Sequence, residues 1–248
     1  MEEIRSRKSA IVQRIRELAR DPSYRIQEKL FLCDGEKLLI EALRSDAEIT
    51  QVFWKGQRNN TLPVFPEEYL LTDELFDFAS PMKNSPGPLF CVRMKNMNKT
   101  GEIKTILLLE QLQDPGNVGT VLRTADAFGI DLVILLPGCA DLYSPKTVRA
   151  SMGAIFRQAV LQIDREQAVR FCREQGLPLY AAALSSRARD LRCVDLHRAA
   201  VAIGSEGHGL SESLKQSCDG EIIIPMSGAA ESLNAAMAAT IVMWEMQR

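Results

Sequence analysis

The sequence predicts an α/β protein: a mostly parallel sheet with helices on both faces, preceded by a small α/β domain. From residue 103 onward, short apolar segments alternate with amphipathic ones, which is typical of parallel strands buried on both faces. The 248 residues are 46% hydrophobic and 25% charged, which is enough for a sizeable core. The polar segment 96–102 has the composition of a linker. We therefore expect an N-terminal domain at 1–95, a linker at 96–102 and a second domain at 103–248.

The first domain is expected to begin with a basic amphipathic helix over its first twenty residues. Ile11, Ile15 and Leu18 share one face of that helix, and Asp21-Pro22 would end it. The segment 1–29 carries eight Lys and Arg against five Asp and Glu, a net charge of +3. The other expected elements are strands at 30–33, 49–54 and 89–94, a helix at 36–44, and short elements between 65 and 80.

The second domain is expected to alternate strands with helices. The strands are expected at 106–109, 132–135, 159–163, 179–184, 199–203 and 221–224. The helices are expected at 117–128, 145–152, 165–175, 211–217 and 234–247. The apolar stripe of the last helix consists of Leu233, Met237, Ile241 and Trp244, and alanines beside it permit close approach of another element. Because ligands of such sheets bind at the carboxyl ends of strands, we expect a site on the loops that follow strands.

Composition and charge disfavour several classes of protein. The chain has 30 Lys and Arg against 32 Asp and Glu, so a surface for a polyanion must come from local clustering. No apolar run approaches the roughly 18 residues of a membrane-spanning helix. The first residues lack the apolar core of a signal peptide, and two early acids argue against a transit peptide, so a cytoplasmic location is expected.

The six cysteines are scattered singly, and the only histidines are His197 and His208. In the absence of a secretion signal, the thiols are expected to be reduced and mostly buried. Neither histidine is spaced with a cysteine as metal ligands are, so no metal site is expected. A Ser-His-Asp hydrolase would have to use one of these two histidines, which disfavours that class.

The first of three polar loops leads into the helix expected at 117–128. Asp114-Pro115-Gly116 forms a turn, and Asn117 is a candidate N-cap. Arg123 lies off the buried face of the helix, about 9 Å along it from Asn117, a gap that an arginine side chain can cover. The alternative is a capped helix with a solvated arginine.

The second loop, Gly204–Leu210, places three glycines in six residues, which lets the backbone approach a ligand closely. Its order, G-x-x-G-x-G, is not that of a dinucleotide site, and no P-loop motif follows, so nicotinamide and nucleoside triphosphate sites are disfavoured. Glu206 is an unusual residue for a mere turn.

The third loop opens the last helix. Ser232 and Asn234 can cap that helix, whose free N–H groups also suit a polar ligand; a capped buried helix is the alternative. Together the three loops predict a polar pocket at one edge of the sheet, without a metal or phosphate signature.

Four motifs follow one another in order along residues 103–248. They are Asp114-x-Gly116-Asn117-x-Gly119-x-x-x-Arg123-Thr124-Ala125, Arg149-Ala150-Ser151-x-Gly153-Ala154, Gly204-x-Glu206-Gly207-x-Gly209, and Ile224-Pro225-Met226 with Ser232-Leu233-Asn234. In these motifs the sequence resembles the SpoU/TrmH branch of the SPOUT RNA methyltransferases. Residues 1–95 resemble, more loosely, the ribosomal-protein-like substrate-binding domain that precedes this catalytic domain, through Tyr24-Arg25 and the segment 31–36.

The resemblance implies transfer of a methyl group from S-adenosylmethionine to a ribose 2′-OH of RNA. It also implies a C-terminal deep trefoil knot and a homodimer packed through the knot and the last helix. The residues implied to bind the cofactor are Leu184, Ile203, Gly204, Ser205, Gly207, Ile224, Met226 and Leu233. Two departures from residues common in the family, Ser205 for Asn and Ala235-Ala236 for Val-Ser, remove no catalytic group.

By the same resemblance, Arg123 is the catalytic arginine. The residues implied to surround it are Asn117, Glu206, Ser232 and Asn234. A guanidinium keeps its proton far above neutral pH. Our hypothesis is therefore that Arg123 holds the ribose phosphate and stabilises the developing alkoxide, with Glu206 orienting it.

RNA is also expected to contact cationic side chains outside the pocket. Arg149, in the second motif, is the first candidate, reaching the RNA from across the dimer. The other candidates, all in the first domain, are Arg5, Arg7, Lys8, Arg14 and Arg25. An ordinary solvated helix face is the alternative interpretation of these residues.

The expected substrate is 23S ribosomal RNA, because minimal transfer-RNA enzymes of this branch usually lack the front domain. Guanosine is a common target base in the branch, although no residue of the sequence is identified as reading a base. The alternatives are a transfer-RNA 2′-O-methyltransferase and a catalytically silent, RNA-binding ribosome-assembly factor of the same fold. A dinucleotide-dependent dehydrogenase is disfavoured by the order of the glycines.

Overall fold

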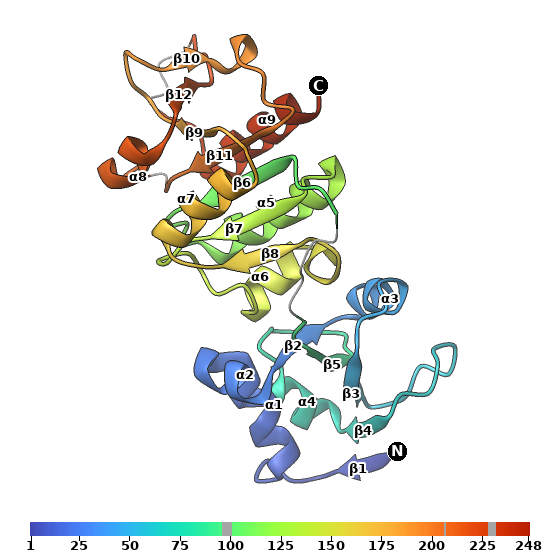
Figure 1. The fold of residues 1–248 in the computed structure, drawn as a ribbon. Coiled ribbons are helices and arrows are strands. Elements are labelled where there is room, and N and C mark those ends of the chain that lie inside the picture. Colours follow the sequence, from blue (N-terminus) through green and yellow to red (C-terminus); the bar gives the residue numbers. More distant parts are fainter. Residues whose placement is uncertain (96–100, 206, 228–231) are drawn as a thin grey trace. The chain divides into compact units, whose positions relative to one another are not determined.

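The computed structural model describes residues 1–95, 101–205, 207–227 and 232–248. The chain forms two compact units, Met1–Asn96 with Asp141–Phe156, and Met97–Ala140 with Arg157–Arg248 (Figure 1). The contacts therefore add the segment 141–156, which comes from the middle of the second predicted domain, to the first unit. The linker predicted at 96–102 falls mainly on residues outside the described part of the chain.

The first unit is built on a mixed five-stranded sheet. Its strands, in spatial order, are β1 (Glu2–Ile4), β4 (Glu67–Leu71), β3 (Ile49–Lys55), β5 (Leu89–Arg93) and β2 (Leu30–Asp34). The pairs β1–β4 and β4–β3 are parallel, and β5 is antiparallel to both of its neighbours. The helices of this unit are α1 (Ala10–Arg20), α2 (Pro22–Glu28), α3 (Glu36–Arg44), α4 (Asp73–Ala79) and α6 (Pro145–Ala150), with the short 3₁₀ helix η1 (Ala154–Phe156).

The start of the chain differs from the prediction of one twenty-residue helix. Residues 2–4 pair with β4 as a strand, and α1 begins only at Ala10. Val12, rather than Ile11, joins Ile15 and Leu18 on the fully buried face of α1. The helix ends before Asp21 as predicted, but Pro22 also starts α2, because a proline fits the first turn of a helix, where its missing N–H costs nothing.

The second unit contains a seven-stranded sheet in which every pair of neighbouring strands is parallel. Its strands, in spatial order, are β10 (Arg189–Asp190), β12 (Gly220–Ile223), β9 (Leu179–Ala182), β11 (Ala199–Ile203), β6 (Thr105–Leu109), β7 (Leu132–Leu135) and β8 (Val160–Gln162). The parallel α/β fold expected from the apolar runs is thus confirmed, with strand ends within two residues of those predicted. The two-residue strand β10 was not predicted.

Helices cover this sheet on both faces. They are α5 (Pro115–Phe128), α7 (Arg165–Glu174), α8 (Glu212–Ser217) and α9 (Ala235–Gln247), with the 3₁₀ helix η2 (Leu191–Cys193). Residues of α7 and α8 share one core with alternate residues of the central strands, such as Ile106 and Leu108. The helix α9 packs against α5 and β11. Since successive residues of a strand point to opposite faces, the intervening residues of β6 are buried on the other side.

The apolar stripe predicted for the last helix is not the face that it buries. The buried face of α9 consists of Ala235, Ala236, Ala239, Val242, Met243 and Met246. Met237 and Trp244 of the predicted stripe are 56% and 57% exposed, and Ile241 is 37% exposed. The helix is apolar around most of its circumference, so its periodicity does not determine which face packs; small alanines allow the close approach instead.

Among the helices of the described residues, none is long and apolar enough to cross a bilayer.

Candidate active site

A cavity of about 360 Å³ lies at the carboxyl ends of β9, β11 and β12. Its walls come from the loop after β9, the glycine loop 204–210, the start of the segment after β12, and the first residues of α9. All eight residues predicted to bind the cofactor line it: Leu184, Ile203, Gly204, Ser205, Gly207, Ile224, Met226 and Leu233. The structure therefore brings together residues that are up to 49 positions apart in the chain. Their role in binding stays a prediction.

The glycine loop is a tight turn whose two ends meet. The backbone N–H of Gly209 donates to the carbonyl of Ser205 at 2.9 Å, and these two residues form an isolated β-bridge. A Cβ added at Gly204 would lie 2.1 Å from the carbonyl carbon of Gly209, so only glycine fits at this position.

The first and third loops meet where α5 and α9 begin. The side-chain amide of Asn234 donates to Oδ1 of Asn117 at 3.4 Å. Asn234 is also the N-cap of α9, because its Oδ1 accepts from the backbone N–H groups of Ala236 and Met237 at 3.0 and 3.3 Å. Two of the predicted catalytic residues are therefore adjacent, and one of them is fixed by the helix it caps.

The other predicted catalytic residues are placed as follows. Ser232 is exposed and lines the cavity. Arg123 is exposed on α5, and none of the hydrogen bonds or ion pairs among the described residues involves it. Glu206 lies outside the described residues. Asn117 was predicted to be the N-cap of α5, but Asp114 takes that position and accepts from the Gly116 N–H at 3.0 Å. The helix starts earlier than predicted because Pro115 is its first residue.

Sequence reasoning missed one cation at this cavity. Lys215 of α8 lines the cavity and is the only Lys or Arg among the lining residues that the structure describes. Its ammonium lies 2.5 Å from Oε1 of the exposed Glu212, and this hydrogen bond lowers the pKa of Glu212. In the sequence, the only indication of a role for Lys215 was its position shortly after the glycine loop.

With this geometry in place, comparison with known proteins decides the family. Residues 104–244 match the sequence profile of the SpoU rRNA Methylase family. The chain belongs to this family. The SpoU/TrmH membership and the methyltransferase class expected from the four motifs are therefore confirmed.

Relatives of this SpoU methylase align over nearly its whole length. The 23S rRNA (guanosine(2553)-2′-O)-methyltransferase RlmP of Bacillus subtilis is 31% identical over 225 residues, which cover 90% of each chain. An AdoMet-bound rRNA methyltransferase from Sinorhizobium meliloti has a TM-score of 0.86 and 27% identity, covering 99% of this chain and 97% of that one. The SpoU methyltransferase AviRb of Streptomyces viridochromogenes has a TM-score of 0.86 and 25% identity, covering 96% of both chains.

The predicted RNA-contacting cations of the first unit differ in their surroundings. Arg25 is a correction: it is only 3% exposed, donates to the carbonyl of Leu18 at 2.6 Å, and pairs with Asp141. Its guanidinium is thus held inside the protein, because a buried cation needs such partners. Arg149 is exposed, and its Nη1 lies 2.8 Å from Sδ of Met82.

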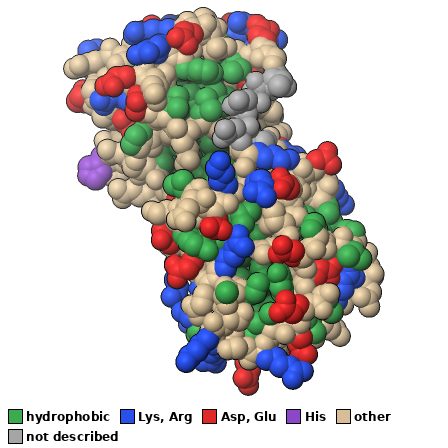
Figure 2. All heavy atoms as spheres, turned by 60° about the horizontal axis from the view of Figure 1, so that its bottom comes forward, with side chains coloured by type: hydrophobic (Ala, Val, Ile, Leu, Met, Phe, Trp, Pro, Cys, Tyr) green, Lys and Arg blue, Asp and Glu red, His purple; other side chains and the backbone are tan. Residues whose placement is uncertain are grey.

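The remaining candidates lie on or before α1. Arg5 pairs with Glu3 at 2.8 Å, Arg14 pairs with Glu28 at 2.7 Å, and the Arg7 guanidinium lies 4.6 Å from the centre of the Phe78 ring. Lys8 is exposed. On the face shown in Figure 2, Lys and Arg side chains lie among Asp and Glu side chains rather than in one cationic field.

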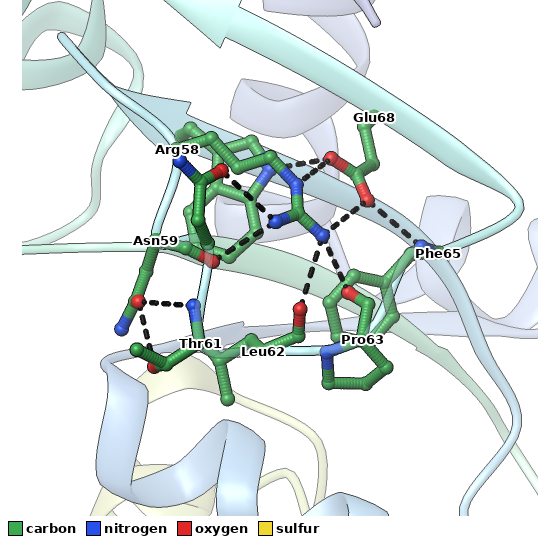
Figure 3. Close-up of polar contacts among 9 residues, drawn as sticks. Arg58, Asn59, Thr61, Leu62, Pro63, Phe65 and Glu68 are labelled. Atoms are coloured by element: carbon green, nitrogen blue, oxygen red, sulfur yellow. Dashed lines mark hydrogen bonds and ion pairs between the residues drawn. The ribbon is translucent and has the colours of Figure 1, made fainter.

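A further cation of this unit has a structural role. Arg58, whose side chain is 15% exposed, donates from Nε to Glu68 at 2.8 Å and from Nη2 to the carbonyl of Pro63 at 2.7 Å (Figure 3). Glu68 also accepts from the Phe65 N–H at 2.8 Å. Burial acts to raise the pKa of Glu68, but hydrogen bonds from Arg58 and Phe65 bring this pKa below its ordinary value. This ion pair holds the loop between β3 and β4 in place.

No group of three or more His, Cys, Asp or Glu side chains gathers to hold a metal ion within the described parts of the chain.

Proposed function

We propose that this SpoU methylase transfers the methyl group of S-adenosylmethionine to a ribose 2′-OH of 23S ribosomal RNA. The observation that carries the proposal is the cavity at the strand ends, which is lined by all eight residues expected to bind the cofactor. The likeness to RlmP along 90% of both chains supports 23S rRNA as the substrate and guanosine as the base.

The residues at the cavity fit S-adenosylmethionine. A volume of about 360 Å³ lies within the usual range for small-molecule sites. Apolar side chains such as Leu184, Ile224 and Leu233 suit an adenine ring, and the backbone of the glycine loop offers N–H and C=O groups. Lys215 would meet the carboxylate of the methionine part. The AdoMet-bound structure from S. meliloti, of the same fold, supports this assignment.

The chain's own contribution to the reaction is to position the ribose and assist loss of the 2′-OH proton. S-adenosylmethionine, when bound, supplies a methyl group on a positively charged sulfur. A guanidinium is not a base at neutral pH, so the role of Arg123 is to hold the ribose phosphate and stabilise negative charge at the 2′ oxygen. The exposure of Arg123, without a partner among the described residues, leaves its guanidinium available for a phosphate. Asn117, Ser232 and Asn234 border the place where the ribose would lie, and Glu206 would orient Arg123.

A homodimer completes the proposal. An exposed apolar face on α9 is formed by Met237, Ile241 and Trp244. In our proposal this face packs against the same face of a second copy of the chain. Exposed apolar side chains at helical spacing are typical of a surface that packs against another chain. The C-terminal trefoil knot belongs to the same proposal. The six cysteines, all free thiols, are compatible with the cytoplasm.

The test is transfer of tritiated methyl groups from S-adenosylmethionine to purified 23S rRNA and, in parallel, to bulk transfer RNA. We expect label in 23S rRNA, resistant to alkaline cleavage at one nucleotide, and not in transfer RNA. The Arg123→Lys variant should lose at least about tenfold in turnover, because an ammonium cannot make the paired contacts of a guanidinium. Label in transfer RNA alone would establish the transfer-RNA alternative. Binding of RNA without methyl transfer to either substrate would establish the silent assembly factor.

A further inference from the structure

Glu110 is a buried carboxylate that the proposed reaction does not use. It follows β6 directly and is only 6% exposed. Its Oε2 accepts from the backbone N–H of Ser211 at 2.7 Å, and its Oε1 accepts from the Ser211 hydroxyl at 2.8 Å. Burying a carboxyl group away from water has a free-energy cost, which hydrogen bonds such as these two to Ser211 offset.

Glu110 makes hydrogen bonds to the residues at both ends of the glycine loop. Its own backbone N–H donates to the carbonyl of Ile203, the last residue of β11, at 2.9 Å. Its carboxylate holds Ser211, the first residue after the loop. One residue therefore contacts the residue that precedes the segment 204–210 and the residue that follows it. The contacts within the loop, between Gly204 and Gly209, add to this closure.

Ser211 extends the connection to α8. Its hydroxyl oxygen accepts from the Leu214 N–H at 3.2 Å, which caps α8, and from Nη1 of Arg165 at 3.5 Å. With its hydrogen given to Glu110, all the bonding capacity of this hydroxyl is used. Lys215, the cation at the cavity, lies on the helix that this cap begins.

We propose that Glu110 is a positioning residue for the cofactor cavity: it fixes both ends of the loop 204–210 and, through Ser211, the start of α8. This inference rests on the proposed function, because the ligand it serves is S-adenosylmethionine. Glu110 does not contact the cofactor in this proposal. It acts by keeping the backbone of the glycine loop at the distance that a bound cofactor requires.

The test compares Glu110→Ala with Glu110→Gln in the full-length protein. Calorimetry with S-adenosylhomocysteine and hydrogen exchange of the backbone amides are the two measurements. We expect Glu110→Ala to weaken binding by about tenfold or more, because two partly buried donors of Ser211 lose their acceptor. Amides of residues 207–211 should exchange faster while those of β7 stay unchanged. Glu110→Gln keeps the acceptor for the Ser211 N–H but turns an NH2 group toward a hydroxyl that already accepts from Leu214 and Arg165, so it should weaken binding less than Glu110→Ala does.

A matched control and a double-mutant cycle separate positioning from general destabilisation. Glu68, a carboxylate of the first unit whose side chain is 6% exposed, serves as the control: Glu68→Ala should lower the melting temperature without changing affinity. Ser211→Ala combined with Glu110→Ala should weaken binding no more than the stronger single variant.

Wild-type affinity and unchanged exchange of 207–211 in Glu110→Ala would overturn the inference. If the wild-type protein itself does not bind S-adenosylhomocysteine, the proposed function fails instead, and the exchange measurement still decides whether Glu110 holds the loop.

Discussion

The glycine loop offers the sharpest single test, the substitution Gly204→Ala. The added Cβ would lie 2.1 Å from the carbonyl carbon of Gly209, 2.2 Å from its oxygen and 2.4 Å from the nitrogen of Leu210. All three are backbone atoms, so no side chain can rotate away, and the loop would have to open by about 1 Å. Overpacking of this kind costs about 1–3 kcal/mol of stability.

A displacement of that size at a binding wall costs about a hundredfold in the rate of the positioned reaction. We therefore expect Gly204→Ala to lower kcat/KM by about two orders of magnitude, measured by methyl transfer to 23S rRNA. Gly220→Ala is the matched control, because its Cβ would meet only the edge of the Tyr180 ring at 3.3 Å in the same sheet. If Gly204→Ala transfers methyl groups at the rate of Gly220→Ala, the backbone of this loop does not shape the cofactor cavity.

Three other substitutions test the remaining assignments. Lys215→Met should weaken S-adenosylmethionine about tenfold but leave methylthioadenosine, which lacks the carboxylate, unaffected in calorimetry; equal losses for both ligands would contradict the assigned contact. Trp244→Asp should convert the proposed dimer to a monomer in sedimentation equilibrium, and an unchanged mass would contradict the dimer contact assigned to α9. Arg25→Met should lower the free energy of unfolding in urea by about 1–3 kcal/mol, because the Leu18 carbonyl and the partly exposed Asp141 lose their donor; unchanged stability would mean that these contacts are not needed.

The architecture of the second unit was predictable because its strands are uniformly apolar. Runs such as 132–135 and 199–203 are apolar at every position, as expected of strands buried on both faces. Such short apolar runs could therefore be identified as strands from the sequence. The two-residue strand β10 escaped prediction because Arg189 and Asp190 carry no apolar pattern. Its pairing depends on β12, which is more than thirty residues further along the chain.

Errors arose where local patterns admit two solutions. The helix α9 is apolar on both sides, and only packing against α5 and β11 decides that the alanines face inward. The helix α5 starts at Pro115, two residues before Asn117, with Asp114 as its N-cap. The prediction placed this start too late because the proline was interpreted as part of a turn. Arg25 looked available for RNA, since sequence does not show that Asp141, 116 residues away, reaches it.

The candidate site was predictable only in part. The order of the glycines disfavoured nicotinamide and nucleoside triphosphate sites, but it was the resemblance to a family that selected the eight predicted residues that line the cavity. Lys215 lies outside the three polar loops, and Glu110, the first residue of the first loop, was assigned no role; their significance appears only when the fold brings β6, β11 and α8 together.

The place of β12 in the sheet constrains how the chain can fold. This strand is among the last segments in the sequence, yet it lies between β9 and β10, both of which precede it. During synthesis, neither β9 nor β10 can complete its ladder until residues 220–223 have left the ribosome. Such non-local pairing is slow. A nascent chain stalled before residue 220 would therefore expose an unpaired edge of β9, the kind of surface on which chaperones act and unfinished chains aggregate.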